Sequence, residues 1–183
     1  MSRVKALRGM VLPALMLPLL GCSSTGVTTP TNTFTSEYFS AALTPGSEVP
    51  TASGNAAGTT NLGTASATTI AYSASGSNLS NVTGVFVYGG ASGANGTKEV
   101  TLCTTTCTSA STSTTASIAP SGTFDSTKVT GVTWQAFLTQ LRTGAAYVQV
   151  TTSGAPNGAV RGQFGTSSSP PNDPFFVLSP TAP

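Results

Sequence analysis

The chain has 183 residues, of which 38% are hydrophobic and only 7% are charged. Three of its seven basic residues lie within the first eight positions, so four Lys and Arg remain against five Asp and Glu, a net charge of −1. No basic patch is left to neutralise phosphates, which excludes a nucleic-acid partner, and charge is too scarce to drive disorder. The remainder is long enough for one domain with a hydrophobic core.

The first residues carry the features of a secretory signal peptide. Basic residues are followed by an apolar run from Met10 to Leu20, shorter than the roughly 20 residues that a membrane-spanning helix needs. The next residues, Gly21 and Cys22, resemble the lipobox at which bacterial lipoproteins are cleaved, although Leu20 is larger than the residue usual there. The resemblance implies that residues 1–21 are removed and that Cys22 is acylated. The alternative is an ordinary signal peptide, cleaved nearby, in which Cys22 has no role.

Lipidation at Cys22 predicts an extracytoplasmic protein anchored to a bacterial membrane, because two acyl chains are enough for stable anchoring. The residue after Cys22 is Ser23 and not an Asp, which favours the outer membrane if the cell is Gram-negative. Residues 22–33 are mostly Ser, Thr, Gly and Pro without periodicity, and we interpret them as a flexible tether.

Period-two alternation begins at residue 34 and predicts half-buried strands. The alternating residues are Phe39, Ala41 and Leu43; Ile70, Tyr72 and Ala74; Val85 and Val87; Val148 and Val150; and Val160, Gly162 and Phe164. Two Asn-Gly pairs, Asn95-Gly96 and Asn157-Gly158, predict type I′ turns. These signals indicate an all-β antiparallel sandwich over residues 34–165.

A glycine-rich stretch extends the first of these turns into a longer loop. It has no Gly-Lys-Ser/Thr and opens no helix, so it is not a phosphate-binding loop, and Ala94 breaks a Gly-x-Ser-x-Gly pattern. We interpret the loop as a candidate interaction surface. Its residues of interest are Gly89, Gly90, Ser92, Gly93, Asn95 and Gly96.

Two cysteines remain once Cys22 is acylated. Cys103 and Cys107 are an even pair in an oxidising compartment, which predicts a disulfide. A soft-metal dithiolate is an alternative, but two thiols without histidine make an incomplete site. Free thiols are the third possibility. Residues 105–117 are nearly all Ser, Thr and Ala, which indicates an exposed loop.

One short helix is predicted at residues 134–142. Its apolar residues recur at helical spacing, with Thr133 placed to cap its start and Gly144 to end it. The stripe consists of Trp134, Phe137, Leu138 and Leu141. Beyond the domain, residues 166–183 form a Pro/Ser-rich tail, in which Phe175 to Leu178 either dock as an edge strand or remain free.

Three segments resemble the chordin-type (CHRD) domain family over about residues 34–165. They are Phe39–Pro50; Leu79–Tyr88 with residues 93–102; and Phe137–Gly144 with Tyr147–Thr152 and residues 156–163. The resemblance implies an immunoglobulin-like β-sandwich, loosely similar to copper/zinc superoxide dismutase. The family's histidines are replaced here by Tyr88 and Thr151, and its Glu before the Ile-Arg-Gly-Gln motif is replaced by Ala159. Without any histidine, dismutase-like redox chemistry lacks its ligands.

The family-matching charges Glu48 and Arg161 are predicted to form a partly buried ion pair, because Arg can grip a carboxylate with two hydrogen bonds. A ligand-binding Arg161 is the alternative.

No histidine is present to act as a base for a serine nucleophile, and a Ser-Lys pair has no local signature. We therefore expect no enzyme and no cofactor, but a non-catalytic, membrane-anchored binding or interaction module of the cell envelope. Its partner would be an envelope protein or a glycan. The alternatives are a metal-binding or redox protein using Cys103 and Cys107, or a structural coat lipoprotein.

Overall fold

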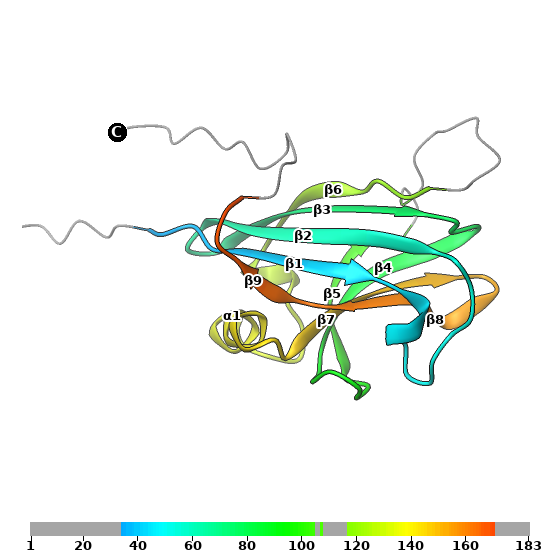
Figure 1. The fold of residues 1–183 in the computed structure, drawn as a ribbon. Helices are drawn as coiled ribbons and strands as arrows, with labels where there is room; N and C mark the ends of the chain where they lie inside the picture. Colours follow the sequence, from blue (N-terminus) through cyan, green and yellow to red (C-terminus); the bar gives the residue numbers. More distant parts are fainter. Residues whose placement is uncertain (1–33, 105–106, 108–116, 171–183) are drawn as a thin grey trace, which may run out of the picture. The chain divides into compact units, whose positions relative to one another are not determined.

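A computed structural model of the protein describes residues 34–104, 107 and 117–170, and Figure 1 shows how their elements are arranged. The predicted signal peptide, Cys22, the predicted tether and Phe175 to Leu178 lie outside these residues. The described strands are β1 (Tyr38–Leu43), β2 (Ala57–Ser66), β3 (Thr69–Ser77), β4 (Val82–Gly89), β5 (Thr97–Cys103), β6 (Ser121–Asp125), β7 (Ala146–Thr152), β8 (Ala155–Gln163) and β9 (Gly165–Ser167).

The strands form two antiparallel sheets that face each other. The first sheet has the order β6-β3-β2-β1-β9 and the second has the order β5-β4-β7-β8. The alternating apolar residues fill the space between the sheets, and side chains such as Phe39, Val85 and Val148 are fully buried there. The predicted all-β sandwich is therefore confirmed, and so are the strands on which the prediction rested.

The helix α1 (Trp134–Thr143) ends one residue later than predicted and lies at one end of the sandwich (Figure 1). The Thr133 hydroxyl accepts a hydrogen bond from Ala136 N, and Gly144 closes the other end with a φ of 70°. Phe137, Leu138 and Leu141 are buried in the core. Among the described residues, no helix is long and apolar enough to cross a membrane.

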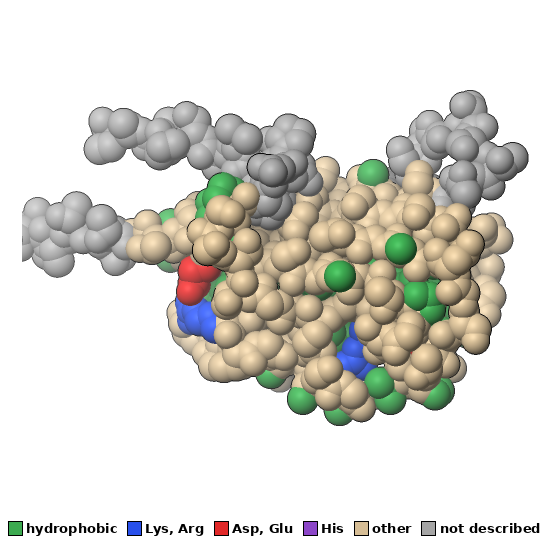
Figure 2. Space-filling model, in the orientation of Figure 1, with side chains coloured by type: hydrophobic (Ala, Val, Ile, Leu, Met, Phe, Trp, Pro, Cys, Tyr) green, Lys and Arg blue, Asp and Glu red, His purple; other side chains and the backbone are tan. Residues whose placement is uncertain are grey.

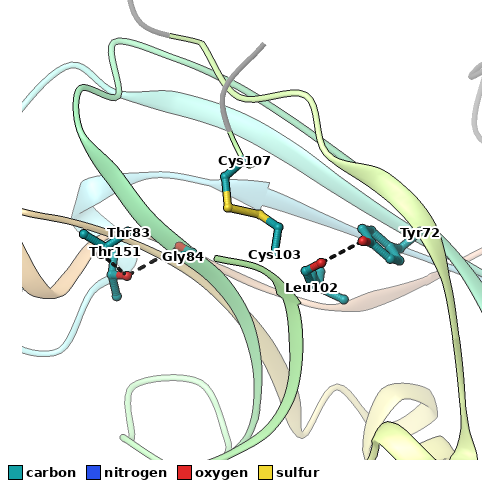
Figure 3. The surroundings of a disulfide bond; sticks show 7 residues. All are labelled: Tyr72, Thr83, Gly84, Leu102, Cys103, Cys107 and Thr151. Carbon is teal, nitrogen blue, oxygen red and sulfur yellow. Dashed lines mark hydrogen bonds between the residues drawn. A yellow bond between two sulfur atoms is a disulfide. The ribbon is translucent and has the colours of Figure 1, made fainter. Parts of the chain in front are cut away.

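Specific bonds also join the two sheets across the core. The Tyr72 hydroxyl on β3 donates to Leu102 O on β5 over 2.7 Å, close to the disulfide between Cys103 and Cys107 (Figure 3). The predicted disulfide is thereby confirmed. At the end of β1, Thr44 exchanges two backbone hydrogen bonds with Arg161 of β8, at 3.0 and 3.1 Å.

Both predicted type I′ turns are wrong. Asn157 and Gly158 lie inside β8, and the chain turns before them, at Ser153 and Gly154. Neither Asn95 nor Asn157 has the positive φ that a type I′ turn requires.

The first sheet also continues past the predicted end of the domain. Residues Gly165–Ser167 form the short strand β9, which pairs with Tyr38, Phe39 and Ser40 of β1. An edge strand of this length needs no apolar alternation of its own, because its backbone hydrogen bonds to β1 hold it.

Candidate binding site on the second sheet

Strand β7 is buried on both of its faces. Val148 and Val150 point into the core, so Tyr147 and Gln149 lie on the opposite, outer face of the second sheet. Two segments cover that outer face. One is the η1 segment (residues 44–52), which contains the 3₁₀ helix η1 (Pro45–Ser47), and the other is the β4–β5 loop (residues 90–96). The fold therefore has a second, polar interior outside the sandwich.

Arg161 is at the centre of this polar interior and is only 1% exposed. Its Nη2 donates to Ala94 O at 2.8 Å and to Ala91 O at 3.2 Å, two carbonyls of the β4–β5 loop. Its guanidinium carbon lies 3.4 Å from the centre of the Tyr147 ring. Arg161 thus fixes the loop to the sheet through charge-assisted hydrogen bonds.

The aromatic row continues beyond Tyr147. Its ring stacks on Tyr88 with a centroid distance of 5.1 Å and an interplanar angle of 5°. Tyr88 in turn meets the edge of Phe86, over which the Lys98 ammonium lies at 4.9 Å. The three aromatic rings lie on β7 and β4, and the cationic side chains of Arg161 on β8 and Lys98 on β5 lie over the two ends of the row.

Three further side chains hold the base of the β4–β5 loop. The Asn95 amide donates to Val49 O at 2.9 Å, joining the loop to the η1 segment. The Tyr147 hydroxyl accepts a hydrogen bond from Gly96 N, and the Gln163 amide donates to Gly90 O at 2.8 Å. Residues 91–98 are nevertheless all exposed, so the anchored loop is also accessible from outside.

The predicted interaction residues fall into two groups. Gly89 is the last residue of β4, and Gly90 is half-buried beside it, so both belong to the base. Ser92, Gly93, Asn95 and Gly96 are exposed. A side chain at Gly96 would collide with the backbone of Gly89, which explains why the loop needs glycine there.

Glu48, at the end of η1, is 4% exposed and reaches the same outer face. Its Oε2 accepts a hydrogen bond from Gln149 Nε2 at 2.5 Å, and the same amide donates to Asn157 O. Gly158 leaves the room for this contact, because a Cβ there would collide with both side chains. Burial raises the pKa of Glu48, an effect that the Gln149 hydrogen bond and the Arg161 charge oppose.

The predicted Glu48–Arg161 ion pair is not formed in the described part of the chain. The two side chains do share one buried cluster, and the charge of Arg161 acts on Glu48. Each has a different partner, however. Arg161 donates to carbonyl oxygens of the β4–β5 loop, and Glu48 accepts from Gln149 of β7. Glu48 Oε1 is buried and has no hydrogen-bond partner among the described residues.

A cavity of about 390 Å³ lies between the η1 segment and the β4–β5 loop. Figure 2 shows the hollow on this face, with basic side-chain atoms at its floor. The cavity contains one carboxylate, one guanidinium and three hydroxyl groups. Its lining residues are Gly46, Ser47, Glu48, Val49, Thr51, Ser92, Gly93, Arg161 and Gln163.

A second buried carboxyl, Glu99, is a feature that the sequence analysis missed. It is 1% exposed, and its Oε1 accepts a hydrogen bond from Gln140 Nε2 of α1 at 3.1 Å. A break in the pairing register between β4 and β5 leaves Glu99 as an extra residue and turns it toward the helix. Burial raises the pKa of Glu99. The strand pattern contains no signal for this irregularity.

A sequence model of the CHRD domain matches residues 39–164, which is more than half of the chain. The chain belongs to the CHRD domain family. The matched region begins at β1, ends just before β9 and contains the whole polar interior of Glu48 and Arg161. Comparison with curated proteins found no match, and comparison with solved structures found none.

The positions at which we expected the histidines of CHRD domains have other roles here. Tyr88 belongs to the aromatic row described above. The Thr151 hydroxyl bonds to the Thr83 hydroxyl at 2.8 Å on the neighbouring strand β4 (Figure 3). Stacking and hydroxyl pairing therefore hold these positions in this CHRD domain.

Proposed function

We propose that this CHRD domain is a non-catalytic binding module that contacts its partner through the β4–β5 loop and the adjoining η1 segment. The observation that carries the proposal is that the loop is both anchored and exposed. Arg161, Tyr147 and Gln163 form hydrogen bonds with its backbone atoms, while residues 91–98 are exposed. An exposed segment that is already ordered loses little conformational entropy on binding, so its contacts contribute more to affinity.

Site-specific photocrosslinking in cells tests this surface. A photoreactive amino acid at Ser92, at the exposed tip of the loop, is expected to capture a reproducible partner. The same amino acid at Ser80, which is equally exposed in the β3–β4 connection, serves as the matched control. If both positions capture the same abundant envelope proteins, the domain has no specific contact at the loop, and the coat interpretation replaces the binding module.

We further propose that the chain is lipid-anchored through Cys22 in the cell envelope. Support comes from the order of basic residues, apolar run and Gly21-Cys22 in the sequence. A Cys22→Ala variant is expected to lose incorporation of labelled fatty acid and to leave the membrane fraction. Retention in that fraction without label would contradict the anchor.

The Cys103–Cys107 alternative has no observation in its favour. The two sulfur atoms are bonded to each other, so neither is a thiolate that can ligate a metal.

A further inference from the structure

We propose that the cavity between the η1 segment and the β4–β5 loop binds a neutral polyhydroxylated ligand, a sugar unit of an envelope glycan. This inference rests on the proposed binding function and names the ligand class of the same surface. It is carried by three properties of the cavity: the balance of its charges, an unpartnered acceptor beside it, and the polar character and size of its lining.

The charges of the cavity oppose each other. Glu48 and Arg161 both line it and both are almost fully buried. An anion is attracted by the guanidinium and repelled by the carboxylate, and a cation meets the reverse. A hydroxyl group can donate to a carboxylate and also accept from a guanidinium or a serine hydroxyl. Neutral hydroxyl groups therefore match this pair of side chains better than an ion of either sign.

Glu48 provides an acceptor that the protein itself leaves unpartnered. Its Oε2 is held by Gln149, whereas its Oε1 is buried with no partner among the described residues. A buried acceptor without a hydrogen bond costs free energy, and a donor from a bound ligand removes that cost. The bond from Gln149 to the other oxygen already orders the Glu48 carboxylate, so binding a donor does not have to order this side chain.

The lining and the size of the cavity narrow the ligand class further. Ser47, Thr51 and Ser92 supply hydroxyl groups, and Val49 is the single larger apolar side chain in the lining. Such walls do not suit an acyl chain or an aromatic ligand. A volume of about 390 Å³ is at the small end of the range for ligand pockets, which indicates one compact ligand.

A neighbouring cavity of about 370 Å³ offers a matched comparison. It is lined by residues 52–56, 78–81 and 152–155 with Ala159, and none of these carries a charge. Ser80 lines this cavity, as Ser92 lines the first one. Each serine is exposed, so a tyrosine at either position fills the nearby space without disturbing the core.

The test is amide NMR on the full chain in a detergent without sugar groups. The neutral probes are glucose, galactose and N-acetylglucosamine. Glucuronate, glucosamine and glycine serve as the anionic, cationic and zwitterionic probes. A neutral sugar is expected to shift the Ser47, Thr51 and Ser92 amides in a saturable way. Binding is expected to be lost in Ser92→Tyr and kept in Ser80→Tyr. Glu48→Gln, which keeps the shape but removes an acceptor, is expected to weaken binding about tenfold.

Three results would overturn the assignment: no saturable shift with any neutral sugar, equal binding by Ser92→Tyr and wild type, or tighter binding of a charged or zwitterionic probe. Capture of a partner at Ser92 in cells is a separate readout. If that capture persists while neutral sugars fail to bind, the binding module stands and only the ligand class is wrong. If capture and sugar binding both fail, the proposed function falls as well.

Discussion

Glu48 and Glu99 are two buried carboxyl groups that this small domain accommodates in the same way. Each has one oxygen bonded to a glutamine amide and one buried oxygen that has no hydrogen-bond partner within the described part of the chain. Burial is the largest influence on both side chains and raises both pKa values. At a given pH, each carboxyl is therefore protonated more readily in the folded protein than in the unfolded chain.

These raised pKa values predict that the two carboxyls contribute more to the stability of the folded state at acidic pH than at neutral pH. A raised pKa in the folded state gives a contribution to stability that is complete below the unfolded pKa and is lost as the pH rises through the folded pKa. Glu48→Gln and Glu99→Gln are expected to reduce the fall in stability between about pH 4.5 and neutral pH, as measured by urea denaturation.

Glu37 serves as a control, because its pKa is shifted in the opposite direction. Its half-exposed carboxylate accepts hydrogen bonds from Arg142, which lower its pKa, so its contribution is present at neutral pH and is lost as the pH falls. Glu37→Gln is therefore expected to lower stability slightly at neutral pH and to reduce the loss of stability on the acidic side of the profile. An unchanged profile in Glu48→Gln and in Glu99→Gln would contradict the raised pKa values of the two buried carboxyls.

Arg161 is expected to need its planar, forked head group rather than only its charge. Arg161→Lys keeps the charge but loses the stacking on Tyr147 and the geometry of the bonds to the loop carbonyls. We predict a loss of about 2–4 kcal/mol in the free energy of unfolding. The matched variant Arg142→Lys affects a surface ion pair and is expected to cost less than about 1 kcal/mol. Equal losses in the two variants would refute the central role of Arg161.

At the scale of elements, the β4–β5 loop and the helix α1 are connected through one side chain. Gln163 Nε2 donates to Gly90 O in the loop and, at 2.7 Å, to Gly144 O at the end of the helix. The end of α1 therefore has two functions: it closes the helix and it positions an amide that holds the candidate binding loop. A disturbance at Gly144 is expected to reach the loop by this route.

Gly144→Ala tests this connection. The φ of 70° at this position is costly for a residue with a Cβ, so we expect a loss of stability of about 1–2 kcal/mol. Faster amide exchange at Gly90 and Gly96 should accompany the loss. Gly154→Ala provides the control, because Gly154 has open space around it and no positive φ. A loop whose exchange rates do not change would show that the helix end and the loop are independent.

At the scale of the whole domain, the two sheets are held by core packing and by polar bonds across the sandwich. The Tyr72–Leu102 bond lies inside the core, and the Thr44–Arg161 bridge lies at the end of β1. The bridge passes from the first sheet to the strand that carries the central arginine of the site. The stability of the sandwich and the geometry of the site are therefore linked through β8.

Tyr72→Phe is expected to weaken the association of the sheets. The substitution keeps the ring against Phe124 but leaves the buried Leu102 carbonyl without its donor. We predict a loss of about 1–2 kcal/mol in chemical denaturation. Tyr38→Phe, on a half-exposed residue of β1, is the control and should change stability by less than about 0.5 kcal/mol. Equal midpoints for the two variants would contradict an energetic role of the Tyr72 bond.

Local signals in the sequence determined the sandwich, the helix and the disulfide. Alternation such as Phe39, Ala41 and Leu43 states which side of a strand is apolar, and Thr133 with Gly144 marks the ends of α1. Cys103 and Cys107 are close in sequence, so their pairing needed little knowledge of the fold. Each of these features depends on residues that lie within a few positions of one another.

The tertiary structure alone decided how the outer face of the second sheet is covered and what its charges contact. The sequence analysis paired Glu48 with Arg161, but their partners, Gln149 and the carbonyls of Ala91 and Ala94, come from segments that are distant in sequence. The alternating pattern predicts that Gln149 faces away from the core. It does not predict that another segment covers Gln149 on that outer face. Hydrogen-bond partners in a polar interior are set by the packing of whole segments, and no spacing along the chain encodes that packing.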